Sequence, residues 1–123
     1  ITTLLKGDAK FAFGFSALQG GAFLYQNIRT LLSYYKKENL SNFQINLDYH
    51  FDGYAKTNAE LNNFCAGFYE QHNIQIEPIY TGKMFFGLYD LIRSNFFPPE
   101  STIVAIHTGG LQGLQGLKQR KMI

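Results

Sequence analysis

The sequence TIVAIH at residues 102–107 is the clearest strand signal in the chain, because β-branched residues run through it almost unbroken. A run of this kind is typical of a strand buried on both faces of a parallel sheet. It continues directly into Thr108-Gly109-Gly110, where a turn can lead to a helix start. We therefore expect a buried strand here that ends at a glycine turn.

Strand and helix patterns alternate in the residues that precede this run. Residues 10–15 (KFAFGF) are a short apolar run, and residues 43–47 (FQINL) alternate apolar and polar side chains, so both segments are predicted as strands. A helix is predicted between them, because apolar residues recur there at the spacing of one helix face: Leu24, Ile28, Leu31, Leu32 and Tyr35.

Two more helices are predicted in the second half of the chain. The first follows Thr57-Asn58-Ala59-Glu60, a possible capping box in which the Thr57 hydroxyl and the Glu60 carboxylate each accept a backbone N–H. The second follows Gly82, after an extended segment at residues 74–79. The order of these elements predicts a single α/β domain over residues 1–123, with flanking helices and a mainly parallel sheet in three layers.

Composition narrows the class of protein. The chain has 123 residues, of which 46% are hydrophobic, and a net charge of +2, so it can bury a core. The basic cluster at residues 118–121 is more typical of a solvated tail than of a nucleic-acid site, and no segment reaches the length of a membrane span. We therefore expect neither nucleic acid nor membrane as a partner. The single cysteine, Cys65, excludes an intrachain disulfide and is expected to be a small buried residue in a cytoplasmic protein.

Two glycine-containing turns are candidate ligand sites, because ligands collect beyond the carboxyl ends of strands in open α/β sheets. They are HTGG at residues 107–110 and YTGK at residues 80–83. The second is not a P-loop, because Glu77 and Met84 stand where that motif needs glycine and serine or threonine. The glycine spacing of the first does not match the dinucleotide fingerprint either. By itself, Lys83 is expected to be structural or to face solvent.

A polar and aromatic loop follows the second predicted strand. Asp48 and His50 flank Tyr49 there, which suggests a general base or a metal ligand, but a third ligand is missing. Local hydrogen bonding is therefore the favoured role for these two residues, and no metal site is predicted. Tyr54 lies in the same loop, and its hydroxyl could serve as an acid or a hydrogen-bond donor.

Together these segments resemble a known family. EPIYTGK at residues 77–83 and IHTGG at residues 106–110 are similar to the C-terminal part of fold-type-II pyridoxal 5'-phosphate enzymes, in the branch of D-cysteine desulfhydrase and 1-aminocyclopropane-1-carboxylate deaminase. FSALQGG at residues 15–21 and DYHFDGYAK at residues 48–56 also resemble this family, so the similarity covers most of the chain. It implies a tryptophan-synthase-β-like fold and, in the intact enzyme, a homodimer that acts on a small amino acid.

The resemblance implies roles for five residues. Tyr54 and Tyr80 correspond to catalytic tyrosines, and Tyr80 also lies beside the cofactor ring. Thr81 corresponds to the residue that faces the pyridine nitrogen, and Thr108 and Gly109 to residues that line the ring. The deaminases of the family carry glutamate at the position of Thr81. A carboxylate keeps the pyridine nitrogen protonated, whereas a hydroxyl can only form a hydrogen bond to it. Thr81 therefore favours D-cysteine desulfhydrase-like elimination, which releases sulfide, ammonia and pyruvate, over the deaminase reaction.

Three parts of the family's active site are not found in this sequence. The Schiff-base lysine, the Ser-Asn-His segment for the substrate carboxylate and the glycine-rich phosphate loop all lie upstream of the matching region. Lys83 belongs to a different motif and does not replace the lysine. The chain is therefore expected to be part of a larger enzyme and to be inactive and without a Schiff base on its own. Three alternatives remain: a 1-aminocyclopropane-1-carboxylate deaminase, a non-enzymatic binding domain without the lysine, and an anion-binding module at Gly109-Gly110.

Overall fold

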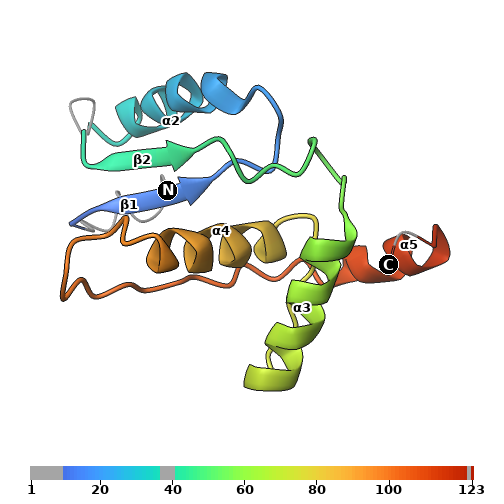
Figure 1. The fold of residues 1–123 in the computed structure, drawn as a ribbon. Coiled ribbons are helices and arrows are strands. Elements are labelled where there is room, and N and C mark those ends of the chain that lie inside the picture. Colours follow the sequence, from blue (N-terminus) through green and yellow to red (C-terminus); the bar gives the residue numbers. More distant parts are fainter. Residues whose placement is uncertain (1–9, 37–40, 122) are drawn as a thin grey trace.

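The computed structural model describes residues 10–36, 41–121 and 123. Two short strands, β1 (Ala12–Phe15) and β2 (Phe43–Asn46), pair in parallel, with Ala12 opposite Phe43 and Phe15 opposite Asn46. Both strands were predicted from their apolar patterns, and both are confirmed. A 3₁₀ turn, η1 (Gly21–Phe23), and the helix α2 (Leu24–Ser33) form the crossover between them (Figure 1).

The helix α2 packs its apolar face on one side of the two strands. Leu32 is buried with Ala12, Phe43 and Ile45, and Leu24 and Ile28 pack partly buried against this cluster, so the predicted face of the helix is confirmed at these residues. Leu31 and Tyr35 were predicted on the same face, but both are about half exposed. The Tyr25 hydroxyl accepts a hydrogen bond from the backbone N–H of Ile45 at 2.9 Å and donates to its carbonyl at 3.2 Å. These bonds fix the helix to the middle of β2.

The helix α4 (Thr81–Arg93) lies on the opposite side of the strands from α2 (Figure 1). Gly87 makes this close packing possible. A Cβ atom at Gly87 would lie 2.6 Å from the ring of Phe15 and 2.8 Å from that of Tyr49. The described residues therefore form an α/β structure with a two-stranded parallel sheet and helices on both sides of it.

The helix α3 (Ala59–His72) packs against α4 around a second core cluster that contains Leu61, Cys65 and Phe68. The buried position expected for Cys65 is confirmed. The capping residue, however, is Asn58 rather than Thr57: the Asn58 side chain accepts the backbone N–H of Leu61 at 2.9 Å. Because the helix begins one residue later than predicted, the Thr57 hydroxyl donates to the side chain of Asn62 instead.

The prediction of a buried strand at residues 102–107 is wrong. The segment is irregular, and its apolar side chains face solvent, with Val104 80% exposed. A strand needs a neighbouring strand to satisfy its backbone groups, and within the described residues none pairs with this segment. The chain continues into the helix α5 (Gln112–Gln119). No helix among the described residues is long and apolar enough to cross a membrane.

Candidate functional site

Glu77 organises the start of α4 with a buried carboxylate. Its oxygen atoms accept the backbone N–H of Ile79 at 2.6 Å, of Tyr80 at 3.1 Å and of Thr81 at 2.7 Å. The first N–H groups of a helix lack partners within the helix, and a negative charge there also complements the helix dipole. The side chain has no exposed surface. Glu77 therefore fixes the turn that carries two of the predicted site residues, Tyr80 and Thr81.

Thr81 is joined to Glu77 in both directions. Its hydroxyl accepts the backbone N–H of Glu77 at 3.1 Å and donates to Oε1 of the same residue at 3.0 Å. The hydroxyl hydrogen is thus already donated, and the hydroxyl oxygen can accept one more hydrogen bond. Thr81 is only 2% exposed, so the Glu77–Thr81 pair forms the floor of this region.

The two predicted catalytic tyrosines meet although 26 residues separate them. The Tyr80 hydroxyl donates to that of Tyr54 at 3.0 Å, and the ring centroids are 5.9 Å apart. Both rings are about half exposed, Tyr54 at 58% and Tyr80 at 47%. The hydrogen bond to Tyr54 is the main cause that raises the pKa of Tyr80, with burial and the charge of Glu77 adding to it. Tyr80 therefore keeps its proton more firmly than an ordinary tyrosine.

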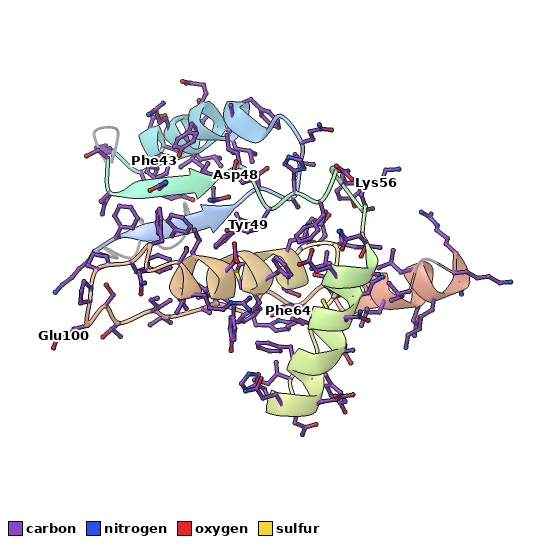
Figure 2. The ribbon with its side chains drawn as sticks, viewed as in Figure 1. Phe43, Asp48, Tyr49, Lys56, Phe64 and Glu100 are labelled. Carbon is purple, nitrogen blue, oxygen red and sulfur yellow. The ribbon has the colours of Figure 1, made fainter. Side chains whose placement is uncertain are left out.

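Lys83 is almost completely buried, at 1% exposed, so of its two expected roles the solvent-facing one is wrong. Its Nζ atom donates to the backbone carbonyls of His50 at 2.8 Å and Gly53 at 2.7 Å. Burial lowers the pKa of Lys83, while the charge of Glu77 acts in the opposite direction. Lys83 thus connects α4 to the loop that carries Tyr54. Figure 2 shows this loop, from Asp48 to Lys56, leaving the carboxyl end of β2 and leading to α3.

The turn at residues 107–110 is fixed by its histidine. His107 Nδ1 accepts the backbone N–H of Gly109 at 3.0 Å, so the other ring nitrogen, Nε2, carries the hydrogen that is donated to the Gln75 carbonyl at 2.8 Å. Gly109 and Gly110 have φ angles of 88° and 89°, which glycine adopts without strain.

The two glycines of this turn have different surroundings. A Cβ atom at Gly110 would lie 3.3 Å from a carboxylate oxygen of Glu77, whereas one at Gly109 would meet nothing within 4 Å. Thr108 is exposed beside them. The backbone of the turn therefore lies close to Glu77 at Gly110, whereas at Gly109 there is open space beside the backbone.

The site residues predicted from the sequence thus gather around a residue whose role the sequence reasoning missed. Glu77 forms hydrogen bonds with Tyr80 and Thr81 and lies next to Gly110, where a Cβ atom would come within 3.3 Å of its carboxylate, and Tyr80 forms a hydrogen bond with Tyr54. The sequence signal was weak, because Glu77 lies four positions before the first residue of α4, outside the N-cap and first-turn positions where acidic side chains usually stabilise a helix start. Within the described residues, the Thr108 side chain has no described hydrogen bond to Tyr54 or Tyr80.

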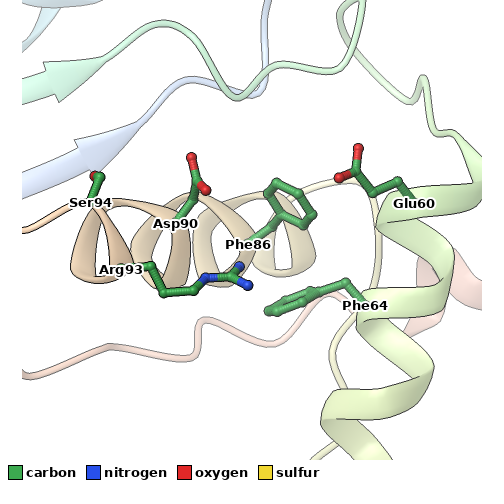
Figure 3. Close-up of a pocket in the computed structure, with 6 residues that line it drawn as sticks. All are labelled: Glu60, Phe64, Phe86, Asp90, Arg93 and Ser94. Atoms are coloured by element: carbon green, nitrogen blue, oxygen red, sulfur yellow. The ribbon is translucent and has the colours of Figure 1, made fainter.

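A surface cavity lies elsewhere. It is an open cavity of about 510 Å³ between α3 and α4, lined by Glu60, Phe64, Phe86, Asp90, Arg93 and Ser94 (Figure 3). None of the predicted site residues lines it. Asp90, on its wall, accepts the hydroxyl hydrogen of Tyr49 at 2.7 Å. The described residues contain no group of three or more histidine, cysteine or acidic side chains that could hold a metal ion.

Comparison with known proteins gives partial matches to one kind of enzyme. The 1-aminocyclopropane-1-carboxylate deaminase of Rhizobium leguminosarum bv. viciae is 33% identical over 72 residues, and that of Methylobacterium nodulans is 31% identical over 72 residues. A Pyrococcus horikoshii protein provisionally given the same name is 38% identical over 66 residues. No family model matches the chain.

These matches cover 54–58% of the chain but only about a fifth of each relative's length. The similarity supports a relationship between this chain and the family that contains these deaminases. Most of each relative's length has no counterpart in this chain.

Proposed function

We propose that this chain is the ring-binding part of a pyridoxal 5'-phosphate-dependent enzyme that deaminates a small amino acid by elimination. The observation that carries the proposal is the hydrogen bond between Tyr54 and Tyr80, because it joins two residues with implied catalytic roles from distant parts of the sequence. The proposed parent is a cytoplasmic homodimer. Its larger domain would have a three-layer, tryptophan-synthase-β-like fold, of which this chain is one α/β portion.

The arrangement of the described residues fits a planar cofactor ring. Tyr80 would lie beside the ring and Thr81 at its pyridine nitrogen, while Thr108 and Gly109 would line it. The open space at Gly109 supports this assignment, because a flat ring can approach the backbone there without meeting a side chain. When bound, the cofactor supplies the electron sink that makes elimination from an amino acid possible.

The state of the Thr81 hydroxyl bears on the choice of substrate. Because its hydrogen is donated to Glu77, the oxygen can only accept a hydrogen bond from a ring nitrogen that carries a proton. A neutral hydroxyl holds that proton less firmly than a carboxylate in direct contact would. This favours a substrate with a good leaving group, and we therefore propose D-cysteine, with sulfide, ammonia and pyruvate as products.

The tyrosine pair would handle protons in this reaction. Tyr80 donates its hydroxyl hydrogen to Tyr54, and this hydrogen bond raises the pKa of Tyr80, so Tyr80 holds its proton and fixes the position of Tyr54. Tyr54 accepts that hydrogen bond, and its own hydrogen remains free to reach the substrate or the leaving group. We propose that the pair assists proton transfer and the departure of the leaving group.

The second candidate is 1-aminocyclopropane-1-carboxylate deaminase activity. The names of the similar proteins favour it, because all three relatives described above carry that name. Thr81 argues against it through the weaker hold on the ring proton. A binding domain without catalysis is the third candidate, and only the presence or absence of activity in the full-length gene product separates it from the enzymes.

Lys83 supports the expectation that this chain does not bind the cofactor covalently. Its amine is buried and donates to two carbonyl groups, so it is not free to react with an aldehyde. We expect no absorption band of a bound cofactor to remain after dialysis of the chain with pyridoxal phosphate. A band that remained and was then removed by borohydride would contradict this expectation.

The decisive experiment is to express the full-length gene and assay D-cysteine and 1-aminocyclopropane-1-carboxylate in parallel. We expect turnover of D-cysteine, and we expect Tyr54→Phe to lower kcat by about 10²-fold or more, as loss of a general acid or base does. Tyr34→Phe is the matched control, because Tyr34 is an exposed tyrosine at the C-terminal end of α2, the helix on the opposite side of the strands from α4. Turnover of the cyclopropane substrate alone would refute the D-cysteine assignment, and activity on neither would favour the binding domain.

A further inference from the structure

The loop that carries Tyr54 has a backbone conformation that two of its residues, Phe51 and Ala55, do not favour. Phe51, Asp52 and Ala55 have positive φ angles of 50°, 66° and 55°, and Gly53 has a φ of 116°. Residues with a Cβ atom rarely adopt this left-handed region, and they persist there only where their surroundings hold them. Contacts from outside the loop must therefore maintain its shape.

The side chain of Lys83 supplies such contacts. Its Nζ atom donates to the carbonyls of His50 and Gly53, which stand at the two ends of the left-handed run. The same two carbonyls accept backbone N–H groups, Gly53 bonding to His50 at 3.1 Å and Lys56 to Gly53 at 3.2 Å. A buried ammonium group needs hydrogen bonds in place of its lost water, and the loop carbonyls provide them. Loop and lysine therefore depend on each other.

Tyr54 follows Gly53 directly, so the bond from Lys83 acts next to it in the chain. Tyr54 is more than half exposed, and its described side-chain contacts are with Tyr80. Its position therefore depends mainly on the backbone that carries it. On the opposite side, Glu77 fixes the backbone N–H of Tyr80, and Lys83 lies three residues after Tyr80 on the same first turn of α4.

We propose that Lys83 is a positioning residue whose buried ammonium holds the loop at residues 50–55, so that the Tyr54 hydroxyl stays within hydrogen-bonding distance of Tyr80. The use of the tyrosine pair in catalysis rests on the proposed function. The holding of the loop rests on the geometry of this chain alone. Lys83 would act through Tyr54 and touch neither substrate nor cofactor.

The test follows the ionisation of Tyr80 by NMR in the complete 123-residue chain, with its eight tyrosines labelled with ¹³C at Cζ. Tyr80→Phe identifies the Tyr80 signal. The ionisable groups that face Tyr80 are Tyr54 and Glu77. Tyr54→Phe removes the hydrogen-bond partner and is expected to lower the pKa of Tyr80 toward about 10, the ordinary value of tyrosine.

Lys83→Met is then expected to lower the pKa of Tyr80 as Tyr54→Phe does, because the released loop carries Tyr54 away. Lys56→Met is the matched control, since Lys56 is an exposed lysine of the same loop region, and the Tyr80 signal should titrate as in the unchanged chain. If Lys83 had only a structural role, replacing it would not change the pKa of Tyr80 in a chain that stays folded. Far-UV circular dichroism reports whether the variant chain is folded.

Lys83→Gln covers the case in which Lys83→Met does not fold. Its amide keeps N–H donors without the charge, and we expect a Tyr80 pKa between those of the unchanged chain and Tyr54→Phe. Both variants are also measured with trimethylamine N-oxide, which favours the folded state. A folded variant at Lys83 whose Tyr80 titrates as in the unchanged chain would overturn the proposal. The titration needs neither cofactor nor substrate, so it is independent of whether the full-length enzyme eliminates sulfide.

Discussion

Replacing Glu77 by glutamine tests whether this one side chain organises the candidate site. Glutamine keeps the shape and one oxygen, which can retain the bonds to the N–H and hydroxyl of Thr81. Its NH₂ group then stands where Oε2 accepts the N–H of Ile79 at 2.6 Å, so two donors face each other. One short hydrogen bond to a charged acceptor is lost, and the partly buried N–H of Ile79 is left without this partner.

The expected cost follows from these bonds. A hydrogen bond to a charged group contributes about 1.5–3 kcal/mol, and an unmet buried donor costs a similar amount, so Glu77→Gln should lower the free energy of unfolding by about 2–3 kcal/mol. Glu77→Ala leaves the N–H groups of Ile79, Tyr80 and Thr81 without this acceptor and should cost more, about 3–5 kcal/mol.

The free energy of unfolding of both variants is measured by urea unfolding, followed by far-UV circular dichroism. An unchanged dependence of this free energy on urea concentration would show that the substitution has not altered the compactness of either the folded or the unfolded state. Glu60→Gln is the matched control. Glu60 is an exposed acid in the first turn of α3, where only the interaction with the helix dipole is lost, about 0.3–1 kcal/mol. If Glu77→Gln cost no more than Glu60→Gln, the organising role of Glu77 would be refuted.

Three further predictions concern packing and ionisation. Gly82→Ala should lower the free energy of unfolding by about 1–3 kcal/mol in the same urea assay, because a Cβ atom there would lie 2.6 Å from Cys65 Sγ and 2.7 Å from the Glu77 carbonyl oxygen; an unchanged midpoint would contradict this packing. Burial, and to a lesser extent the charge of Glu77, raises the pKa of the Cys65 thiol to about 12, so at pH 8 it should react with a disulfide reagent only after urea is added, and rapid reaction of the folded chain would show otherwise. Burial and the hydrogen bond to Asp90 raise the pKa of Tyr49 in the folded chain to about 12, whereas the pKa of an ordinary tyrosine is about 10. The folded state therefore holds the Tyr49 proton more tightly than the unfolded state. The stability that this contributes is present below about pH 10 and is lost as the pH rises from there to 12. Tyr49→Phe should make urea stability fall less steeply over that range, and an equal slope would count against the assignment.

Individual helices and strands could be predicted where a short segment has a clear apolar pattern and the surface that it packs against lies in the same chain. Residues 43–47 alternate apolar and polar side chains, and β2 forms there because Phe43 and Ile45 can bury themselves under α2. The helix predicted after Gly82 is α4, which begins one residue before Gly82, at Thr81. In both cases the pattern and the partner surface lie within the described chain.

The strand predicted at residues 102–107 failed for the opposite reason. Its β-branched residues favour an extended chain, but propensity alone cannot satisfy backbone groups that need a neighbouring strand. The capping prediction failed on a smaller scale. Thr57 and Asn58 are both good capping residues, and the choice between them depended on where the helix meets the core at Leu61.

The candidate site was predicted as a set of residues, and its geometry was not. Resemblance pointed to Tyr54 and Tyr80, but only the structure places their hydroxyl groups 3.0 Å apart. The burial of Lys83 and Glu77 ran against the usual exposure of charged residues. Lys83 is buried because the carbonyls of His50 and Gly53, far away in the sequence, replace its water, and such long-range contacts leave no local trace. Glu77 is buried because the N–H groups of the turn that follows it, at Ile79, Tyr80 and Thr81, converge on its carboxylate.

The uncovered segment at residues 102–107 determines how the chain behaves when it is concentrated. It contains β-branched residues and no acidic residue, lysine or arginine, and Val104 projects almost fully into solvent. Short, uncharged, β-prone segments of this kind act as templates on which other chains add strands. Aggregation should therefore begin at this segment, before the rest of the fold opens. Val104 is the position at which a charged side chain would act as a gatekeeper against it.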